Sequence, residues 1–261
     1  MNEIELLEQQ AVDTALKSLW QEAIEINKKL LTLDKKNIPA TLRLGFAYLQ
    51  TSKFKEAKKY YQKALKLQSG NSVAKENLER IKILQTKSPK RSKKSPLHLD
   101  PNLFLEIPGK TKSIILVNLG QKNILAQFTV GQQVYLKLKK RKVEIRTKLN
   151  DYAGSLPDDI SKRLLLFLKA GSEYSVFIKE ANLNRVIVFV REEKKGRKVS
   201  HYLSFPQNSQ ANIAQITQEK GDEEVEEPNE NELEKLAEAL TNEEKDYLPY
   251  GHESEEEEAE E

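Results

Sequence analysis

Residues 37–48 carry the pattern that decides the fold of the N-terminal third, and they read Asn37-Ile38-Pro39-Ala40-Thr41-Leu42-Arg43-Leu44-Gly45-Phe46-Ala47-Tyr48. The apolar and charged positions of this stretch alternate at a helical period, which predicts a helix over residues 37–50. The small residues Gly45 and, further on, Ala57 allow two helix backbones to approach closely. The stretch therefore predicts one helix of a tightly packed pair.

On both sides of this stretch, residues 3–85 alternate apolar and charged positions at a helical period. This pattern predicts helices near 3–16, 20–33, 37–50, 54–67 and 71–85. From Gly45 through Phe54, Ala57, Tyr61 and Ala64, the small and aromatic positions resemble the 34-residue tetratricopeptide repeat (TPR). A shift back by one period places Ala11, Ala23 and Leu30 beneath Gly45, Ala57 and Ala64, although Asn27 stands where the family usually has an aromatic residue. The expected domain over residues 1–85 is thus two repeats and a capping helix, stacked because each pair leaves one face unburied.

The resemblance to TPR proteins implies a groove, lined by the first helix of each pair, that binds extended or helical peptides. The expected groove residues are Leu42, Arg43, Phe46, Leu49 and Gln50. Some members clamp a C-terminal carboxylate with Lys and Asn, but Leu42 and Phe46 occupy those positions here, which favours an apolar peptide instead. The alternative is that these side chains only pack against the next repeat or a second domain.

The charge of the chain is divided unevenly along its length. The net charge is +3, but residues 1–218 hold 40 Lys and Arg against 20 Asp and Glu, whereas residues 219–261 hold 3 against 20. Residues 86–102 are basic, with two Ser-Pro steps and no apolar periodicity, which predicts a linker. Residues 207–261 are rich in Gln, Asn and then acid, which predicts a disordered acidic tail, apart from one short amphipathic segment around Leu233 and Leu240.

Residues 103–206 change to short β-branched or aromatic runs separated by turn residues, which predicts a β-rich domain. The expected strands are 113–117, 124–128, 134–138, 143–146, 174–178, 185–191 and 198–205. One helix is expected between Pro157 and Gly171, with Ile160, Leu164, Phe167 and Leu168 on one face. The fold class is therefore α+β in two domains: helical hairpins, then a mostly antiparallel sheet with one helix.

Within this domain, the run Tyr152-Ala153-Gly154-Ser155-Leu156-Pro157 before a helix, with Val130-Gly131-Gln132 upstream, is similar to HIRAN domains over residues 130–190. Those are small β-barrel modules that grip single-stranded DNA ends. Their Asn and Asp between strands have no counterpart near residues 142–148. The alternative is a β domain that shares only the turn chemistry.

Two basic clusters are candidate phosphate-binding sites. They comprise Lys90, Arg91, Lys93 and Lys94 in the linker, and Lys139, Lys140, Arg141 and Lys142 beside Tyr135. The alternative for each is a solvated charged surface. The aromatic residues form no visible row for stacking bases.

Several function classes lose support from composition alone. No cysteine is present, which excludes disulfides, thiolate zinc sites and cysteine nucleophiles. His98, His201 and His252 lie far apart, and no serine lies in a catalytic motif, so we expect no metal, no cofactor and no enzyme activity. No signal peptide or spanning segment is seen, which predicts a cytoplasmic protein without a membrane partner. The expected function is a protein-interaction adaptor that binds a protein or peptide partner; the alternative is a nucleic-acid-associated protein that uses the basic linker and β domain, modulated by the acidic tail.

Overall fold

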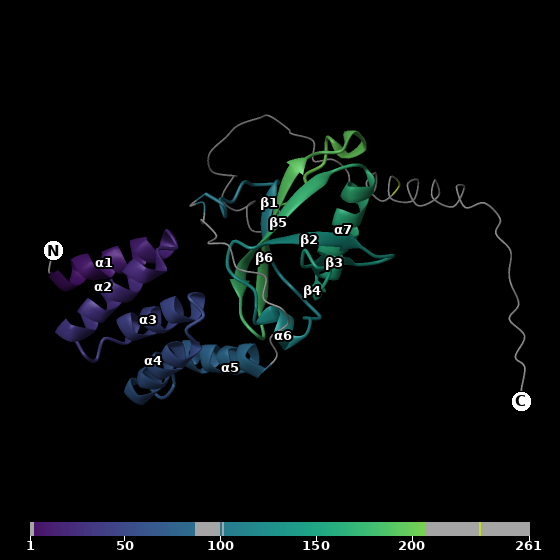
Figure 1. The fold of residues 1–261 in the computed structure, drawn as a ribbon. Coiled ribbons are helices and arrows are strands. Elements are labelled where there is room, and N and C mark those ends of the chain that lie inside the picture. Colours follow the sequence, from purple (N-terminus) through teal and green to yellow (C-terminus); the bar gives the residue numbers. More distant parts are fainter. Residues whose placement is uncertain (1–2, 87–99, 101, 207–234, 236–261) are drawn as a thin grey trace, which may run out of the picture.

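The computed structural model describes residues 3–86, 100, 102–206 and 235, and its N-terminal part consists of five helices (Figure 1). They are α1 (Glu3–Leu16), α2 (Trp20–Leu33), α3 (Ile38–Gln50), α4 (Phe54–Leu67) and α5 (Ser72–Thr86). Each begins and ends within a residue of its predicted position. The predicted helical hairpins are thereby confirmed.

Local chemistry explains where these helices begin. Asn37 caps α3, because its side-chain oxygen accepts a hydrogen bond from the backbone N–H of Ala40 at 2.8 Å. Asn71 does the same for α5 through the N–H of Ala74 at 2.9 Å. The helices then bury their small residues: Ala23, Ala57, Ala64 and Ala74 are fully enclosed. The hairpins are therefore set by caps at their ends and by short side chains at their contacts.

The C-terminal part is a six-stranded antiparallel sheet in the order β1-β6-β5-β2-β3-β4. Its strands are β1 (Thr111–Ile115), β2 (Gln133–Leu138), β3 (Val143–Arg146), β4 (Tyr152–Ser155), β5 (Glu173–Ala181) and β6 (Val186–Lys194). A bridge between Val117, just after β1, and Ser155 on β4 brings the two edges together, so the sheet is curled. The expected α+β architecture is confirmed.

One long helix, α7 (Asp158–Lys169), follows β4 and covers the inner face of the sheet. Pro157 is its N-cap residue, in agreement with the predicted opening at Pro157-Asp158-Asp159, and the two aspartates lie in its first turn. Leu164 is fully buried among inward-facing strand residues such as Val143, Val176 and Val188. This inner side forms the core, and the opposite side of the sheet faces outward.

Two of the predicted strands are wrong. Residues 124–128 lie instead in the short helix α6 (Lys122–Leu125) and the turn after it, and Leu125 and Phe128 are both buried. Short apolar runs do not distinguish strand from helix by periodicity, which is why this segment was misassigned. Residues 198–205 form a 3-10 turn, η1 (Arg197–Val199), and irregular chain that buries Val199 and Phe205.

Strand β4 is absent from the sequence prediction. Its sequence, Tyr-Ala-Gly-Ser, has the composition of a turn, and the sequence reading placed it before the helix as such. Gly154 has a φ of 158°, close to extended backbone, and a side chain there would meet Leu116 at 3.2 Å. The strand therefore depends on tertiary contacts with β3 and with the segment after β1.

Helix α5 joins the helical part to the sheet (Figure 1). The guanidinium of Arg80 donates to two backbone carbonyls after α6, those of Ala126, at 2.8 Å, and of Phe128. Glu79 forms an ion pair with Lys122 at 2.9 Å, and the Glu76 carboxylate accepts from the N–H of Leu183 at 3.0 Å. Three residues from two successive turns of α5 thus hold loops of the sheet.

Most of the predicted linker over 86–102 and the predicted acidic tail over 207–261 lie outside the described residues. In the part of the chain that is described, no helix has the length and apolar character needed to cross a membrane.

Candidate functional site

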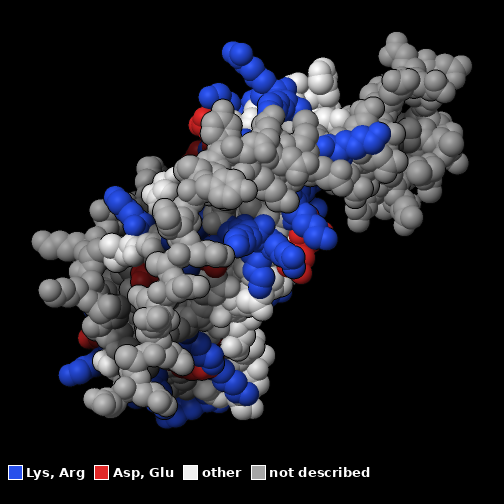
Figure 2. Space-filling view, turned by 90° about the vertical axis from the view of Figure 1, so that its right-hand side faces the viewer, with Lys and Arg blue, Asp and Glu red and all other residues white. Residues whose placement is uncertain are grey.

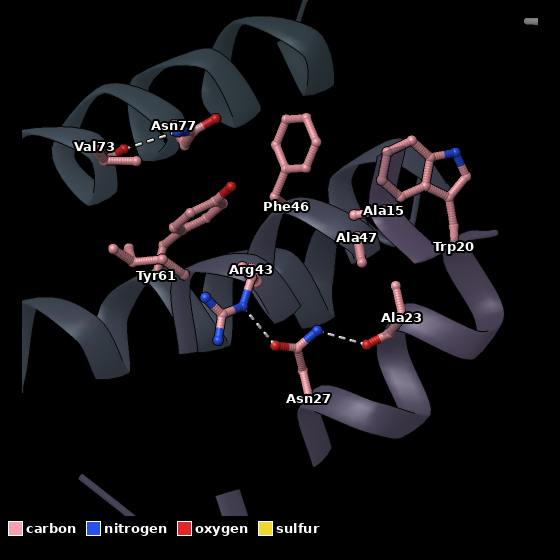
Figure 3. A pocket seen from close by; sticks show the side chains of 11 residues that line it. Ala15, Trp20, Ala23, Asn27, Arg43, Phe46, Ala47, Tyr61, Val73 and Asn77 are labelled. Atoms are coloured by element: carbon pink, nitrogen blue, oxygen red, sulfur yellow. Dashed lines mark hydrogen bonds between the residues drawn. The ribbon is translucent and has the colours of Figure 1, made fainter. Parts of the chain in front are cut away.

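The helical part carries a cavity of about 230 Å³ that is open to solvent on one side. Its lining comes from all five helices, α1 through α5, and α3 contributes the most residues (Figure 3). The lining residues are Ala15, Trp20, Ala23, Asn27, Leu42, Arg43, Phe46, Ala47, Tyr61, Val73 and Asn77. The cavity is large enough for one or two side chains of a bound molecule.

One wall of the cavity is apolar and aromatic. The rings of Trp20 and Phe46 meet edge to face, with 5.7 Å between their centroids and an angle of 75°. Phe46 remains 36% exposed, and Leu42 lies one turn before it on α3. A ring that packs on one side and stays accessible on the other can receive an apolar side chain from a partner.

The lining of the cavity is almost entirely apolar, and Asn27 is a buried polar residue within it. This side chain is 1% exposed, donates to the carbonyl of Ala23 at 2.7 Å, and accepts from Nε of Arg43 at 3.1 Å. Both interactions are drawn in Figure 3. Asn27 thereby orients the Arg43 guanidinium within the cavity wall.

Arg43 and Tyr61 hold polar groups without hydrogen-bond partners. Among the described residues, the buried side-chain atoms in this state are Nη2 of Arg43 and the hydroxyl oxygen of Tyr61. Glu8 lies 3.7 Å from Nη2, which is an ion pair but too long for a hydrogen bond. An unsatisfied buried polar group costs about 1–3 kcal/mol, so both groups are destabilising as they stand.

Burial shifts the ionisation of the same two groups. Desolvation lowers the pKa of Arg43, and the nearby Glu8 only partly opposes this. Burial raises the pKa of Tyr61 well above its ordinary value, against a smaller opposing effect of Arg80. Tyr61 is therefore a neutral hydroxyl at physiological pH, able to donate one hydrogen bond, and Arg43 is a cation short of acceptors.

The structure brings three of the five predicted groove residues to this cavity and leaves two elsewhere. Leu42, Arg43 and Phe46 line it. Leu49 is 7% exposed and belongs to the core cluster around Tyr61, because the last turn of α3 is packed inside the helical part. Gln50 ends α3 and does not reach the cavity.

The sequence reading missed Trp20, Asn27 and Tyr61 as parts of the site. A signal for two of them was present, because the 34-residue period places Asn27 beneath Tyr61 and Trp20 beneath Phe54. An amide where the repeat usually has an aromatic ring leaves room and supplies a hydrogen-bonding group. The exchange that weakened the match of the first repeat thus supplies the amide that accepts a hydrogen bond from Arg43.

The second basic cluster forms the tip of the β2–β3 hairpin. Lys139, Lys140, Arg141 and Lys142 are all exposed, and the N–H of Lys139 closes the turn on the carbonyl of Lys142 at 2.9 Å. Within the described residues, no ion pair involves these four side chains. On the face displayed in Figure 2, Lys and Arg side chains visibly outnumber Asp and Glu among the described residues. The linker cluster Lys90, Arg91, Lys93 and Lys94 lies outside the described residues.

The outer side of the sheet next to this hairpin carries aromatic and cationic side chains in register. Tyr135 on β2 is opposite Arg146 on β3, and Arg146 is opposite Tyr152 on β4. Tyr135 is 43% exposed, and the Arg146 guanidinium lies 5.6 Å from the centre of the Tyr152 ring. Arg146 is already engaged by Glu144 at 2.7 Å. The two aromatic rings come from β2 and β4, with Arg146 of β3 between them, so the sequence shows no row of aromatics.

Among the comparisons with known proteins, a family match falls in the helical part of the chain. Residues 39–71 match the tetratricopeptide repeat family, which covers α3, α4 and the turn that follows. That match confirms the better of the two predicted repeats. No curated protein matches the chain. The resemblance of residues 130–190 to HIRAN domains stays a prediction.

Proposed function

We propose that this protein is a non-enzymatic adaptor that binds a peptide segment of a partner protein in the cavity of its helical part. A tetratricopeptide repeat suggests protein–protein interaction in general. The observation that carries the finer proposal is the cavity itself, because Leu42 and Phe46, two residues expected in the groove, form its apolar wall with Trp20. The proposal includes the cytoplasmic location expected from composition.

The chemistry of the wall favours an apolar side chain as the anchor of the partner. Burying a side chain of leucine or phenylalanine size is worth about 1.5–3 kcal/mol, which is enough for one anchor to dominate a weak peptide complex. The Lys and Asn of a C-terminal carboxylate clamp are replaced here by Leu42 and Phe46. We therefore propose recognition of an internal peptide segment.

The test is capture from nuclease-treated native lysate by the full-length protein and by its Phe46→Glu variant. We expect proteins that the wild type retains to be lost from the variant, because a carboxylate at position 46 would have to be desolvated beside Trp20. Bound proteins are identified by mass spectrometry, and each is then titrated as a purified component.

Leu67→Glu is the matched control, because Leu67 is exposed to the same extent, 36%, but lies outside the cavity. Circular dichroism must show equal helicity for both variants. If Phe46→Glu keeps both its fold and its partners, the adaptor proposal is wrong.

A second candidate function is binding of single-stranded nucleic acid by the sheet. It is favoured by the hairpin cluster, whose four cations lack ion pairs among the described residues, beside the exposed ring of Tyr135. Residues 103–206 hold 20 Lys and Arg against 9 Asp and Glu, a net charge of +11. Phosphates would contact the hairpin, and a base would stack on Tyr135.

The test is a salt titration of the full chain with oligothymidylate, comparing the wild type with a variant that carries alanine at 139–142. Each lost phosphate contact should lower the slope of log affinity against log salt by about 0.7. A control variant removes the same amount of positive charge from α4. Its salt slope should change less than that of the hairpin variant. The control carries alanine at the exposed positions Lys55, Lys58, Lys59 and Lys66.

In a second experiment, the affinity for a linear single strand is compared with the affinity for a circular single strand of equal length. Preference for a free end would support the HIRAN resemblance, whereas equal binding would leave simple phosphate neutralisation. No binding of either strand at low salt would remove this candidate.

A further inference from the structure

The cavity of the helical part has an apolar wall that solvent can reach. Phe46 is 36% exposed, and Trp20 and Leu42 are partly exposed beside it. Ala15 and Ala47 line the cavity with them and are too short to fill it (Figure 3). Removing apolar surface from water is favourable by about 25 cal/mol per Å². This wall therefore favours a segment that offers apolar side chains along one face.

The chain itself contains a segment of this kind in residues 232–240, which lie outside the described residues apart from Lys235. Leu233, Leu236 and Leu240 recur at i, i+3 and i+7, a spacing that places them on one face of a helix. Lys235 is helical and exposed in the structure, and the helical period sets it on the face opposite the leucines. The segment thus combines a helical period with an apolar face that matches the apolar wall.

The chain between the sheet and this segment is long enough to reach the cavity. Phe205 still pairs with Gly109 at the edge of the sheet, and residues 206–232 follow before Leu233. A stretch of about 27 residues extends to roughly 90 Å. Helix α5 has 15 residues, lines the cavity and holds the sheet, so the cavity lies within about one helix length, roughly 22 Å, of the loops that α5 holds. The tether therefore spans the distance easily.

Charge favours the same contact. Residues 3–86 hold 15 Lys and Arg against 10 Asp and Glu, whereas residues 219–261 hold 3 against 20. Within the described part of the chain, none of the five lysines of α4 forms an ion pair. Each surface pair is weak, but a tethered acidic segment meets these lysines at high effective concentration. The acidic residues thus hold the tail near the helical part and stay outside the cavity, whose lining suits the leucines alone.

We infer that residues 232–240 of the chain's own tail bind in the cavity as an amphipathic helix, with their leucines against the wall of Trp20, Phe46 and Leu42. Bound there, the segment competes with the peptide of a partner protein, so the tail regulates the adaptor by occupying its site. This inference rests on the proposed adaptor function and adds its regulation. A tethered segment acts at an effective concentration of about millimolar, which a partner must overcome to bind.

Trp20 reports whether the cavity is occupied, because it is the single tryptophan of the chain and lines the cavity. The full-length protein is compared with a leucine variant that carries Leu233→Ser, Leu236→Ser and Leu240→Ser and keeps the length and charge of the tail. We expect the emission of the variant to shift to longer wavelength, because water replaces the leucines beside the indole. A synthetic peptide of residues 229–243 should reverse this shift, and should not do so when the variant also carries Phe46→Glu.

The matched control carries Ile213→Ser, Ile216→Ser and Val225→Ser, at three apolar positions of the tail outside the segment. Its Trp20 emission should equal that of the wild type. The second measurement is the capture from lysate described above. The leucine variant should retain about threefold more of each partner, or more, because its cavity is no longer partly occupied, whereas the control should retain the same amount as the wild type.

Equal emission and equal capture by the leucine variant and the wild type would overturn the inference and leave the adaptor proposal standing. A shift that the control shows equally would also overturn it, since the tail would then act without its leucines. An emission that changes with protein concentration would place the segment in the cavity of a second copy and overturn the contact within one chain. If the peptide shifts Trp20 emission but no capture requires Phe46, the contact stands and the adaptor proposal fails.

Discussion

At the scale of single residues, side-chain size decides how closely α3 and α4 approach. A Cβ on Gly45 would lie 3.1 Å from the ring of Tyr61, and Tyr61 is fully buried. Asn27, the equivalent of Tyr61 one repeat earlier, is smaller and polar, and it leaves the space in which Arg43 and the cavity lie. The absence of a side chain at Gly45 therefore allows the tight hairpin. The exchange of an aromatic residue for Asn27 leaves the opening beside it.

Gly45→Leu should destabilise the protein by about 1–3 kcal/mol, because the added side chain must displace the Tyr61 ring in a packed core. The gain of roughly 1 kcal/mol in helix propensity over glycine is too small to offset this. The free energy of unfolding is measured by urea denaturation with Trp20 fluorescence.

Gly70→Ala is the control for that experiment. No atom lies within 4 Å of a Cβ there, so we expect a change of at most about 0.5 kcal/mol. Equal stability of Gly45→Leu and the wild type would show that the contact between Gly45 and Tyr61 does not limit how closely α3 and α4 approach.

At the scale of elements, α5 has two roles: it closes the cavity of the helical part, and it holds the sheet. One face closes the cavity through Val73 and Asn77. Another face holds the sheet through Glu76, Glu79 and Arg80. Desolvation lowers the pKa of Arg80, which is the expected cost of burying a guanidinium against carbonyls rather than carboxylates. A helix that merely capped a repeat would not carry such a residue.

Arg80→Met should weaken the contact between α5 and the sheet, because the carbonyls of Ala126 and Phe128 lose their donor. Leaving these acceptors unpaired should cost about 1–3 kcal/mol of stability. Hydrogen exchange measured by mass spectrometry should become faster in residues 122–130 than in β5 and β6.

Lys82→Met, at an exposed position of the same helix, is the control and should leave exchange unchanged. Unchanged exchange in Arg80→Met as well would mean that the two parts are held together by other contacts.

At the scale of the whole molecule, charge is the dominant asymmetry. Residues 1–218 have a net charge of +20 and residues 219–261 a net charge of −17. Individual surface ion pairs are worth little, but a tethered polyanion acts at high effective concentration. The tail therefore competes with any other polyanion for the basic surface.

Deleting residues 219–261 should raise the affinity of the protein for oligothymidylate several-fold at low salt. The difference should shrink toward zero at about 0.5 M salt, because screening then shortens the range of the attraction to a few ångströms. Replacing the tail's acidic residues with Gln and Asn keeps its length and should have the same effect as deletion. An affinity unaffected by either change at low salt would leave the tail with no role in binding.

Most of the fold could be predicted from the sequence where local rules decide. The five helices follow from a 3.6-residue period and from the spacing of small and aromatic residues in a 34-residue repeat. Strands β2, β3, β5 and β6 follow from β-branched runs, and α7 from its Pro-Asp-Asp start. Each of these elements is favoured by residues within a few positions of one another, so no long-range contact is needed to find it.

The remainder was decided by contacts between segments far apart in the chain. β4 is a strand only because β3 and the residues after β1 pair with it, and 124–128 is not a strand because Leu125 and Phe128 are buried from a helical turn. The site divides in the same way. Leu42, Arg43 and Phe46 share one helix face and were predicted from one resemblance, but the cavity requires Asn27 and Tyr61 from two other helices. Local patterns in the sequence indicate which side chains of α3 could face a partner. The tertiary structure decided that Nη2 of Arg43 and the hydroxyl of Tyr61 are buried without hydrogen-bond partners among the described residues, because burial and the loss of water depend on how all five helices pack.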